Sequence, residues 1–384
     1  MSEIRVNNLS NESNSGGPTI SGITTFSSPY FFVPPAGNTA ERPDNPEKGS
    51  LRFNTDTAHL EYYRGSAGWS ELEASSEELN GGYRGLIQGG NSSPNWGGKI
   101  DYFNIATLGS SAVWGDQVHT QSSGAACASR TRAVCAGGNE PGTPAVNHIQ
   151  YNTIASTGTS TDFGDLTQAR WGLGAVSNQT RGVFAGGSSS GDENNGLNIM
   201  DYITIASTGN AVDYGDITSG VYMSGCASST RGVYQIGKAG ASPSTTNSNI
   251  MEYITTATTG NTTDFGDALG AISGRQACSN STRGVVAGGS PGYSNVIEYI
   301  TIASTGNSTD FGDLFQARYW CAAVASPTRA VWSGGYRNSP SAGFDTTQDY
   351  VEIMTTGNAL DFGDVATTAH PHALAACSNG HGGL

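Results

Sequence analysis

The chain has 384 residues, of which 54 are glycine and only 13% are charged, and its net charge is −14. This composition favours many short strands joined by tight turns over long amphipathic helices, so we expect an all-β protein. No lysine- or arginine-rich stripe is available for a phosphate backbone, so nucleic acid is not an expected partner. No apolar run approaches about 18 residues and no secretory signal pattern is present, so we expect a soluble product made in a cytoplasm, without membrane insertion.

The first 78 residues differ from the rest in composition. Residues 1–39 are polar and rich in Ser, Asn, Gly and Pro, which predicts an extended arm that lies along a partner. Residues 40–78 contain the stretch "GSLRFNTDTAHLEYYRGSAGWSELEA", which predicts a small β module of two or three strands. Its expected small core consists of Leu60, Tyr62, Trp69 and Leu72.

Within this module, Arg-Phe-Asn-Thr-Asp-Thr is followed by Leu-Glu-Tyr and then by a Trp. Over about residues 40–75 the pattern resembles the short β module near the N-termini of bacteriophage tail-fibre and virion structural proteins, particularly those of marine phages of the cyanophage type. The resemblance implies a virion component, present in multiple copies per particle, that docks on other virion proteins through residues 1–78.

A sequence repeat follows. The string RGLIQGG at residue 84 has relatives at spacings of 48, 49, 50, 52 and 46 residues, and a motif related to TDFGD keeps the same period. The second motif ends in an aspartate in each of the six copies. The repeated arginines are Arg84, Arg132, Arg181, Arg231, Arg283 and Arg329, and the repeated aspartates are Asp116, Asp165, Asp216, Asp267, Asp313 and Asp364.

Each copy predicts four strands, and a four-stranded unit of this length repeated several times is typical of a β-propeller blade. The order of a strand ending in Gly-Gly, a loop, an aromatic strand, a turn and a fourth strand resembles the kelch repeat. The resemblance covers roughly residues 82–384, although the Trp usual in the kelch fourth strand stands only at Trp114. We therefore expect residues 79–384 to form a six-bladed kelch-like propeller.

The two ends of the repeat array complement each other. The first copy lacks its first strand, whereas the C-terminal "HALAACSNGHGGL" matches the first strand of the fifth copy around Cys278. We expect residues 372–379 to complete the first blade and so to close the propeller, which removes open sheet edges.

The cysteines and histidines give no clear metal signature. Four of the six cysteines occupy one repeat position that also accepts Val, which indicates buried core thiols rather than disulfides. No histidine recurs in phase, and His370 and His372 are at best a weak pair. Two carboxylates per repeat, such as Asp162 and Asp165, suit calcium but fall short of its usual six to eight oxygens. We expect no metal and no cofactor, with calcium as the alternative.

The repeated carboxylates also argue against catalysis. A catalytic pocket usually breaks repeat symmetry, whereas these carboxylates recur in every copy, so we expect no enzyme and no catalytic residue. "STDFG" partly matches the Asp box of sialidases, but its closing Thr-Trp is missing. A contact between the repeated Arg and Asp, such as Arg181 with Asp216, is a structural alternative for these residues.

Recognition is expected where the copies differ, in the loops after Gly-Gly. These loops carry aromatic and cationic residues that could stack on a sugar or anchor a protein, and solvated loops are the alternative. The candidates are Trp96, Tyr293, Tyr336, Arg337 and Phe344. The sequence thus predicts a tail- or fibre-associated virion protein that recognises a host-surface glycan or protein. The alternative is a structural decoration or connector protein without receptor binding.

Overall fold

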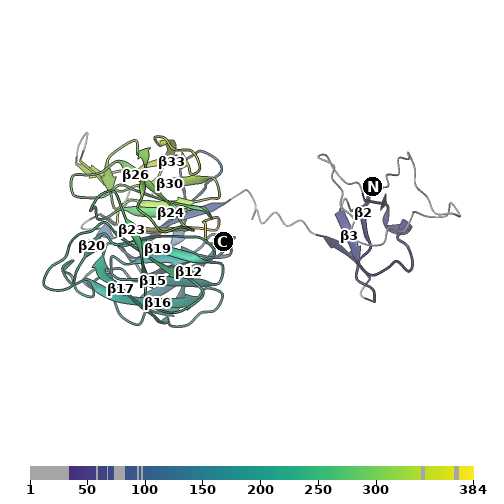
Figure 1. Ribbon diagram of the computed structural model, residues 1–384, viewed down its shortest axis with the longest axis horizontal. Helices are drawn as coiled ribbons and strands as arrows, with labels where there is room; N and C mark the ends of the chain where they lie inside the picture. Colours follow the sequence, from purple (N-terminus) through teal and green to yellow (C-terminus); the bar gives the residue numbers. More distant parts are fainter. Residues whose placement is uncertain are drawn as a thin grey trace, which may run out of the picture. The chain divides into compact units, whose positions relative to one another are not determined.

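The computed structural model describes residues 34–57, 59–66, 68–72, 83–92, 95–96, 98–338, 342–366 and 372–384. It divides the chain into two compact units, Met1–Glu77 and Glu78–Leu384, which we describe separately. The described residues form strands and turns, and their one helical element is the 3-10 turn η1 (Thr39–Glu41) (Figure 1). The expectation of an all-β protein is confirmed. No helix in the described ranges has the length and apolarity needed to cross a bilayer.

The first unit contains one four-stranded sheet. Its strands are β1 (Ala36–Gly37), β2 (Leu51–Asn54), β3 (His59–Tyr63) and β4 (Trp69–Leu72), in that order. The short β1 runs parallel to β2, and the other pairs are antiparallel. Before β2, η1 is held by a capping box between Asn38 and Glu41.

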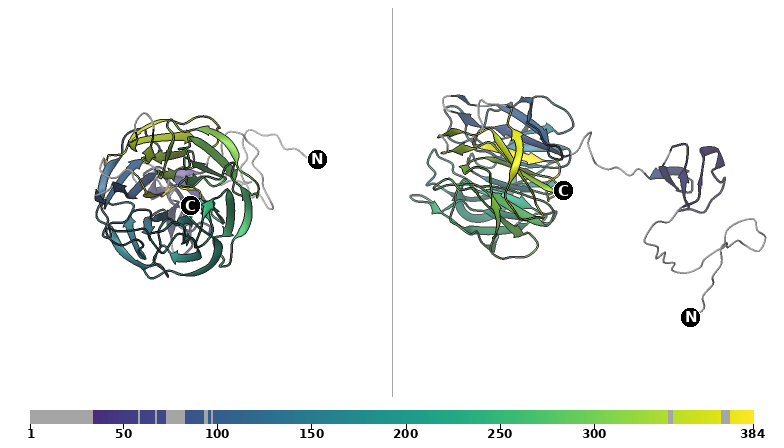
Figure 2. Two further views of the ribbon diagram at one scale, coloured as in Figure 1. Left: turned by 90° about the vertical axis from the view of Figure 1, so that its left-hand side faces the viewer. Right: turned by 90° about the horizontal axis from the view of Figure 1, so that it is seen from above.

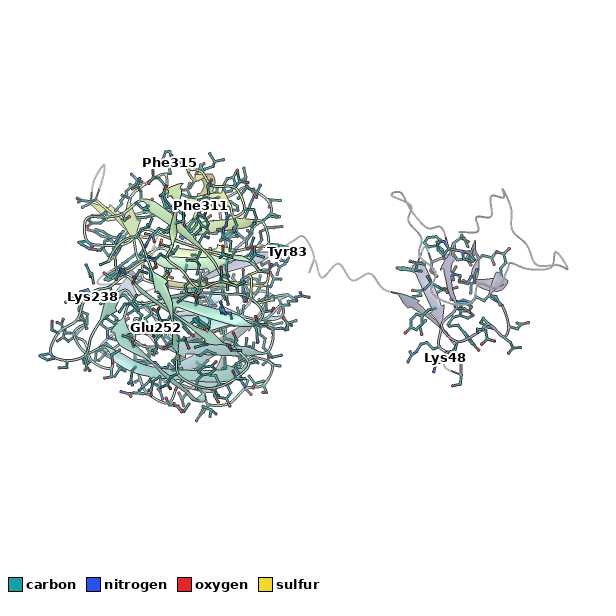
Figure 3. All side chains as sticks on the ribbon, viewed as in Figure 1. Lys48, Tyr83, Lys238, Glu252, Phe311 and Phe315 are labelled. Atoms are coloured by element: carbon teal, nitrogen blue, oxygen red, sulfur yellow. The ribbon has the colours of Figure 1, made fainter. Side chains whose placement is uncertain are left out.

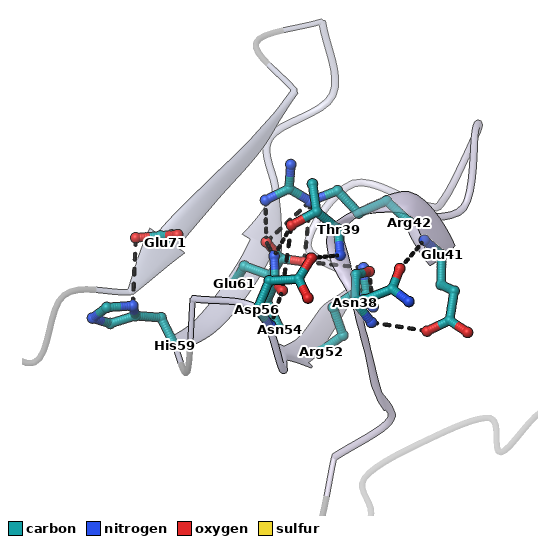
Figure 4. Close-up of polar contacts among 10 residues, drawn as sticks. All are labelled: Asn38, Thr39, Glu41, Arg42, Arg52, Asn54, Asp56, His59, Glu61 and Glu71. Carbon is teal, nitrogen blue, oxygen red and sulfur yellow. Dashed lines mark hydrogen bonds and ion pairs between the residues drawn. The ribbon is translucent and has the colours of Figure 1, made fainter.

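A buried carboxylate organises this small sheet (Figure 4). Glu61 is fully buried and lies 2.5 Å from the guanidinium of Arg42 and 3.1 Å from that of Arg52. The hydrogen bond from Arg42 lowers the pKa of Glu61, although burial opposes it. The expected apolar core is wrong in this respect: Leu60, Tyr62 and Trp69 are only partly buried. Among the described residues of this unit no second sheet covers the first, and an ion-pair network occupies the centre.

The second unit consists mainly of six four-stranded antiparallel sheets in its described part. The first contains β35 (Leu374–Ser378), β5 (Arg84–Gly89), β8 (Lys99–Asn104) and β9 (Ala112–Asp116). The second contains β10 (Ala125–Ala128), β11 (Arg132–Ala136), β12 (His148–Thr153) and β13 (Thr161–Asp165). The third contains β14 (Gly174–Ser177), β15 (Arg181–Ala185), β16 (Leu197–Thr204) and β17 (Val212–Val221).

The remaining sheets repeat this order. The fourth contains β18 (Ser224–Ala227), β19 (Arg231–Gln235), β22 (Ile250–Thr255) and β23 (Thr263–Asp267). The fifth contains β24 (Gln276–Ser279), β25 (Arg283–Ala287), β26 (Val296–Thr301) and β27 (Thr309–Asp313). The sixth contains β29 (Ala322–Ala325), β30 (Arg329–Ser333), β33 (Thr347–Glu352) and β34 (Leu360–Asp364). The second to sixth repeats therefore each supply four strands, as their sequences predict, and the first repeat supplies three.

Short strands lie in the connecting loops. They are β6 (Asn91–Ser92), β7 (Asn95–Trp96), β20 (Lys238–Ala239), β21 (Thr246–Asn247), β28 (Arg318–Tyr319), β31 (Tyr336–Arg337) and β32 (Gly343–Phe344). The hairpin of β20 and β21 extends the third sheet, because β20 pairs with the end of β17. These loops carry the differences between the repeats.

The C-terminal strand completes the first sheet. β35 pairs antiparallel with β5, with Ala376 opposite Ile87, although almost 300 residues separate them in the chain. This pairing confirms the expectation that residues near the C-terminus supply the missing first strand. The first strands of the six sheets contact one another in the order β35, β10, β14, β18, β24, β29 and again β35. In Figure 2 (left) the sheets surround a common axis.

The outer edge of each sheet is covered by the next repeat. Gly209 donates its N–H to the carbonyl of Phe163 at 2.8 Å, and Ala211 donates to Asp165 at 2.8 Å. The same contact joins the sixth repeat to the first, where Gly109 donates to Phe362 at 2.9 Å. Because the fourth strands are paired in this way, their backbone groups are not left open to other chains.

These contacts explain the TDFGD motif. Phe163 packs edge-on against Tyr151 of its own sheet, with ring centroids 5.9 Å apart, and belongs to a core cluster with Ile205 of the next repeat. Gly164 has φ of +145°, and a Cβ there would clash with the carbonyl of Gly209. The motif is therefore a packing element, in which the glycine permits the close approach of the neighbouring turn.

The repeated arginine has the same role in each copy. The guanidinium of Arg181 lies over the ring of Tyr202 at 4.3 Å and donates to the carbonyl of Ala257 in the next repeat at 2.8 Å. Arg329 reaches the carbonyl of Ala106 at 3.0 Å and so links the sixth repeat to the first. The expected contact between Arg181 and Asp216 is wrong, because the carbonyls at the neighbour's turn are the nearer acceptors.

Small residues line the common axis. The first strands enclose a cavity of about 60 Å³ that is lined by Ala, Val, Ser and Cys side chains. All six cysteines are free and buried, which confirms the expectation of core thiols. Burial raises the pKa of the Cys135 and Cys226 thiols to about 12, so they stay protonated and unreactive at neutral pH. The C-terminal residues close one end of this axis, where His381 lies 2.9 Å from the carbonyl of Ala128.

Candidate functional site

The end of the six-sheet unit opposite the C-terminal residues begins with six equivalent backbone positions. Each lies one or two residues before a first strand, and each has a φ between 54° and 67°. Glycine, serine and alanine occupy four of them, and large aromatics occupy the other two. The six residues are Ser123, Gly172, Tyr222, Gly274, Trp320 and Ala373.

Tyr222 and Trp320 therefore hold a left-handed conformation that disfavours bulky side chains. Such a residue costs about 1–3 kcal/mol and persists only where its surroundings impose it, often at a binding site. Hydrogen bonds between neighbouring copies impose it here. Ala373 donates its N–H to the carbonyl of Trp320 at 3.0 Å, and Trp320 donates to that of Gly274 at 3.0 Å. The backbone thus aims two large rings at one end of the axis.

Above these positions lies a concave cavity of about 470 Å³, which we call the basin. This volume suits a ligand of a few sugar rings or a peptide side chain. Its apolar walls are aromatic, and polar residues from the second repeat form part of its rim. The lining residues used below are Trp171, Tyr222, Trp320, His372, Asn139 and Glu140.

The aromatic residues form a continuous ridge across several repeats. Trp171 contacts Tyr222 at 5.4 Å between ring centroids, Tyr222 contacts Trp320 at 5.6 Å, and Trp320 contacts Tyr319 at 4.9 Å. His372 stacks on Trp320 at 5.8 Å and on the partly exposed Phe344 at 4.8 Å. Mutual packing of this kind fixes the orientation of the rings.

Buried ion pairs hold the turns that carry these rings. Arg170, directly before Trp171, lies 2.8 Å from Asp201, and both side chains are inaccessible to solvent. Arg318, directly before Tyr319, lies 3.0 Å from the equally buried Asp349. Burial lowers the pKa of Arg170, while the Asp201 carboxylate opposes that shift. Two charges so deeply placed fix the turn in one position, because breaking either pair leaves an uncompensated charge.

The polar groups near the basin include a second acidic residue. Tyr222 donates its hydroxyl to Glu193 at 2.9 Å, and the ammonium of Lys238 forms an ion pair with the same carboxylate. Burial, followed by the hydrogen bond to Glu193, raises the pKa of Tyr222, so the phenol stays neutral. Lys238 and Tyr83 lie at opposite ends of the six-sheet unit, and Lys238 marks the basin end (Figure 3).

Three of the five predicted ligand residues meet on this ridge. Tyr293 stacks on Tyr336 at 6.3 Å, and Tyr336 meets Phe344 at 5.6 Å. Arg337 instead hydrogen-bonds Gln316 at 3.0 Å and lies 3.6 Å from Asp345. The side chain of Trp96 lies outside the described residues.

The central residues Trp171, Tyr222 and Trp320 are absent from the sequence-based candidates. They lie in the turn before the first strand of a repeat, whereas the prediction considered only the loops after Gly-Gly. A signal was present, because the copies have either a small residue or a large aromatic there. A large aromatic at a position that is otherwise small departs from the repeat and marks a local difference between the copies.

The chain matches no known protein family and no curated protein.

Proposed function

We propose that the six sheets form a six-bladed, kelch-like β-propeller that is closed by β35. Three observations support this architecture. The first strands contact one another in cyclic order, each fourth strand bonds the following repeat, and the last repeat bonds the first through Gly109 and Phe362. A closed arrangement of this type leaves no open sheet edge, which suits a protein exposed outside a cell.

The propeller binds a neutral glycan of the host surface in the basin. The observation that carries this proposal is the pair Tyr222 and Trp320, two large aromatics kept at positive φ where the other copies have glycine, serine or alanine. Aromatic faces stack on the apolar faces of sugar rings, and the neighbouring hydroxyls and carboxylates can take their hydroxyl groups. Glu140 and Glu193 at this end and a net charge of −14 disfavour an anionic ligand.

The whole chain is a structural protein of a bacteriophage virion, associated with a tail or fibre and present in several copies. Its first 78 residues dock on other virion proteins, and the propeller is displayed. The resemblance of residues 40–75 to phage virion modules supports this assignment, together with the separate compact unit that contains them. We propose recognition without catalysis, because the carboxylates of the TDFGD-related motif recur in every copy, whereas a catalytic pocket usually breaks repeat symmetry.

A glycan array probed with the full chain tests the recognition. Trp320→Gly is the sharpest variant, because Gly172 and Gly274 already hold the equivalent backbone conformation without strain. It removes the stacking ring and is expected to weaken glycan binding about 5- to 150-fold, at about 1–3 kcal/mol per stacked aromatic. Phe315→Ser is the matched control, since Phe315 is 74% exposed and is not among the described lining residues of the basin.

Two results would contradict the proposal. If Phe315→Ser weakened glycan binding as much as Trp320→Gly, the binding would be nonspecific adsorption to exposed aromatic side chains. Absence of glycan binding, together with tight binding of the full chain to another virion protein, would favour the structural connector instead.

A further inference from the structure

The second sheet breaks the repeat symmetry at a buried position. The third, fifth and sixth sheets pair a buried arginine with an acid on the third strand, as in Arg170 with Asp201. The second sheet has two glutamines there, and Gln150 donates to Gln121 at 2.6 Å. A neutral pair therefore replaces the ion pair in the second sheet, and the residues around it do not have to accommodate two buried charges.

Two histidines lie next to this glutamine pair. His119 follows β9 and His148 begins β12, and no other repeat has a histidine at either matching position of the sequence. Gln150 accepts from the N–H of His119 at 3.3 Å and donates to its carbonyl at 2.9 Å, and Gln121 donates to the carbonyl of His148 at 3.1 Å. The buried amides therefore fix the backbone of both histidines.

The two imidazoles share one carboxylate. Their rings lie 4.0 Å apart and nearly parallel. Nδ1 of His119 and Nε2 of His148 each lie 3.9 Å from Oε1 of Glu140. One ligand atom from each of the three residues falls within 4.8 Å of the others. Oε1 of Glu140 is shielded from solvent and accepts no hydrogen bond from any described residue.

Two further carboxylates face the opposite sides of the rings. Nε2 of His119 lies 3.7 Å from Asp162, and Nδ1 of His148 lies 3.7 Å from Asp165. A metal-ligating histidine commonly directs its second ring nitrogen to a carboxylate, which fixes the tautomer and makes the ligating nitrogen more basic. In both histidines the ring nitrogen away from Glu140 lies near a carboxylate, at ion-pair rather than hydrogen-bond distance.

We propose that His119, His148 and Glu140 bind one divalent transition-metal ion of the Zn²⁺ class. Two imidazole nitrogens and one carboxylate oxygen are a ligand set that zinc accepts, with a fourth position left for water or a ligand group. Calcium is disfavoured, because it requires six to eight oxygen ligands. The site goes beyond the glycan recognition proposed above and does not depend on it, although Glu140 also lines the basin.

The movement required for binding is small. Ligand atoms on a tetrahedral zinc ion lie about 3.3 Å apart, given bonds of about 2.0–2.1 Å. The histidine nitrogens are 3.9 Å from the Glu140 oxygen, so they approach it by several tenths of an ångström, and the two nitrogens, which lie within 4.8 Å of each other, must also come closer together. The stacked rings must also turn about their Cβ–Cγ bonds so that the lone pairs converge. Side-chain exposures of 29% and 34% leave room for this rotation.

Metal titration of the full chain without a purification tag tests the site. The chain is stripped with a chelator, and Zn²⁺ and Co²⁺ are added separately while heat and the visible Co²⁺ spectrum are recorded. We expect one tight site per chain and a Co²⁺ spectrum of low coordination number. We expect no comparable binding of Ca²⁺.

The variants His119→Gln and His148→Gln are each expected to reduce affinity at least 100-fold. His59→Gln is the matched control, because His59 also lies beside a carboxylate, 3.6 Å from Glu71, and is not part of this cluster. Thermal unfolding without metal verifies that each variant folds. Unchanged affinity in both cluster variants, or no binding by the folded parent chain, would overturn the proposal.

A second measurement covers a variant that fails to fold. Zn²⁺ bound only to the native chain raises its unfolding temperature in proportion to the logarithm of metal concentration. The parent and His59→Gln chains are expected to show this rise. A parent chain whose unfolding temperature is insensitive to Zn²⁺ at concentrations that saturate a micromolar site would also overturn the proposal.

Discussion

The two ends of the six-sheet unit are built from the same six first strands but differ in chemistry. At one end, which we call the tail end, residues 379–384 fold over the axis, and Gly382 donates its N–H to the carbonyl of Ser279 at 2.8 Å. At the basin end, Tyr222 and Trp320 keep a strained backbone and line a cavity of about 470 Å³. The comparison teaches that repeated residues supply the scaffold, whereas the aromatic residues that line the basin stand where the copies differ.

Among the changes that test this comparison, removal of the C-terminal strand is expected to cause the largest loss in the free energy of unfolding. Deletion of residues 373–384 removes β35, so that β5, β10 and β29 lose a packed neighbour. We expect a loss of at least about 5 kcal/mol, comparable with the whole stability of many domains. Differential scanning calorimetry measures the loss. The shorter deletion of residues 379–384 is the control and should cost less, and an unchanged midpoint in the longer one would contradict this account.

Breaking a buried ion pair beneath the basin is expected to have the next largest effect. Asp201→Asn leaves the guanidinium of Arg170 buried without its acid, which typically costs about 3–5 kcal/mol. Gln150→Met, at the equivalent position of the second sheet, removes only neutral hydrogen bonds and is expected to cost about 1–3 kcal/mol. Chemical denaturation compares the two. Equal losses would show that the ion pair and the glutamine pair have the same structural role.

The tail end is expected to respond to pH. His381 donates from Nε2 to the carbonyl of Ala128 at 2.9 Å, and its Nδ1 accepts from the N–H of Gly383 at 3.1 Å. Burial lowers the pKa of this imidazole below its ordinary value. The unfolded chain, with a histidine pKa of about 6.5, therefore binds the proton more readily than the folded chain.

The stability due to neutral His381 is thus complete above about pH 6.5 and is lost as the pH falls from there towards the lower folded-state pKa. Its slope is at most about 1.4 kcal/mol per pH unit. Denaturation of the parent and of His381→Gln between about pH 7.5 and 5 isolates the contribution. The variant should show a flatter dependence, and parallel curves would refute the role of this residue.

The repeat scaffold was predictable because its demands recur. The glycine of TDFGD and the strand pattern appear six times, so the period identified four strands per copy and the strand returned by the C-terminus. The contacts of the repeated arginine were not predictable, because its acceptors are backbone carbonyls such as that of Ala257, and every residue type has a backbone carbonyl.

The candidate sites were only partly predictable for a related reason. The sequence indicated three loop aromatics as ligand-binding candidates, and the structure brings them together. They are Tyr293, Tyr336 and Phe344. His119 and His148 are 29 positions apart and in different repeats, so no short motif joins them. Their proximity arises from the packing of the β9 loop against the start of β12. The centre of the N-terminal sheet was not predictable either, because the buried Glu61 is an exception to the usual burial of apolar residues.

A structure of the full chain bound to a glycan selected on the array, determined by electron cryomicroscopy or crystallography, tests the central claim most directly. The account predicts a sugar ring stacked on Trp320 or Tyr222 inside the basin, with the tail end empty of ligand. A glycan bound at the tail end or along the outer strands, with the basin unoccupied, would contradict it.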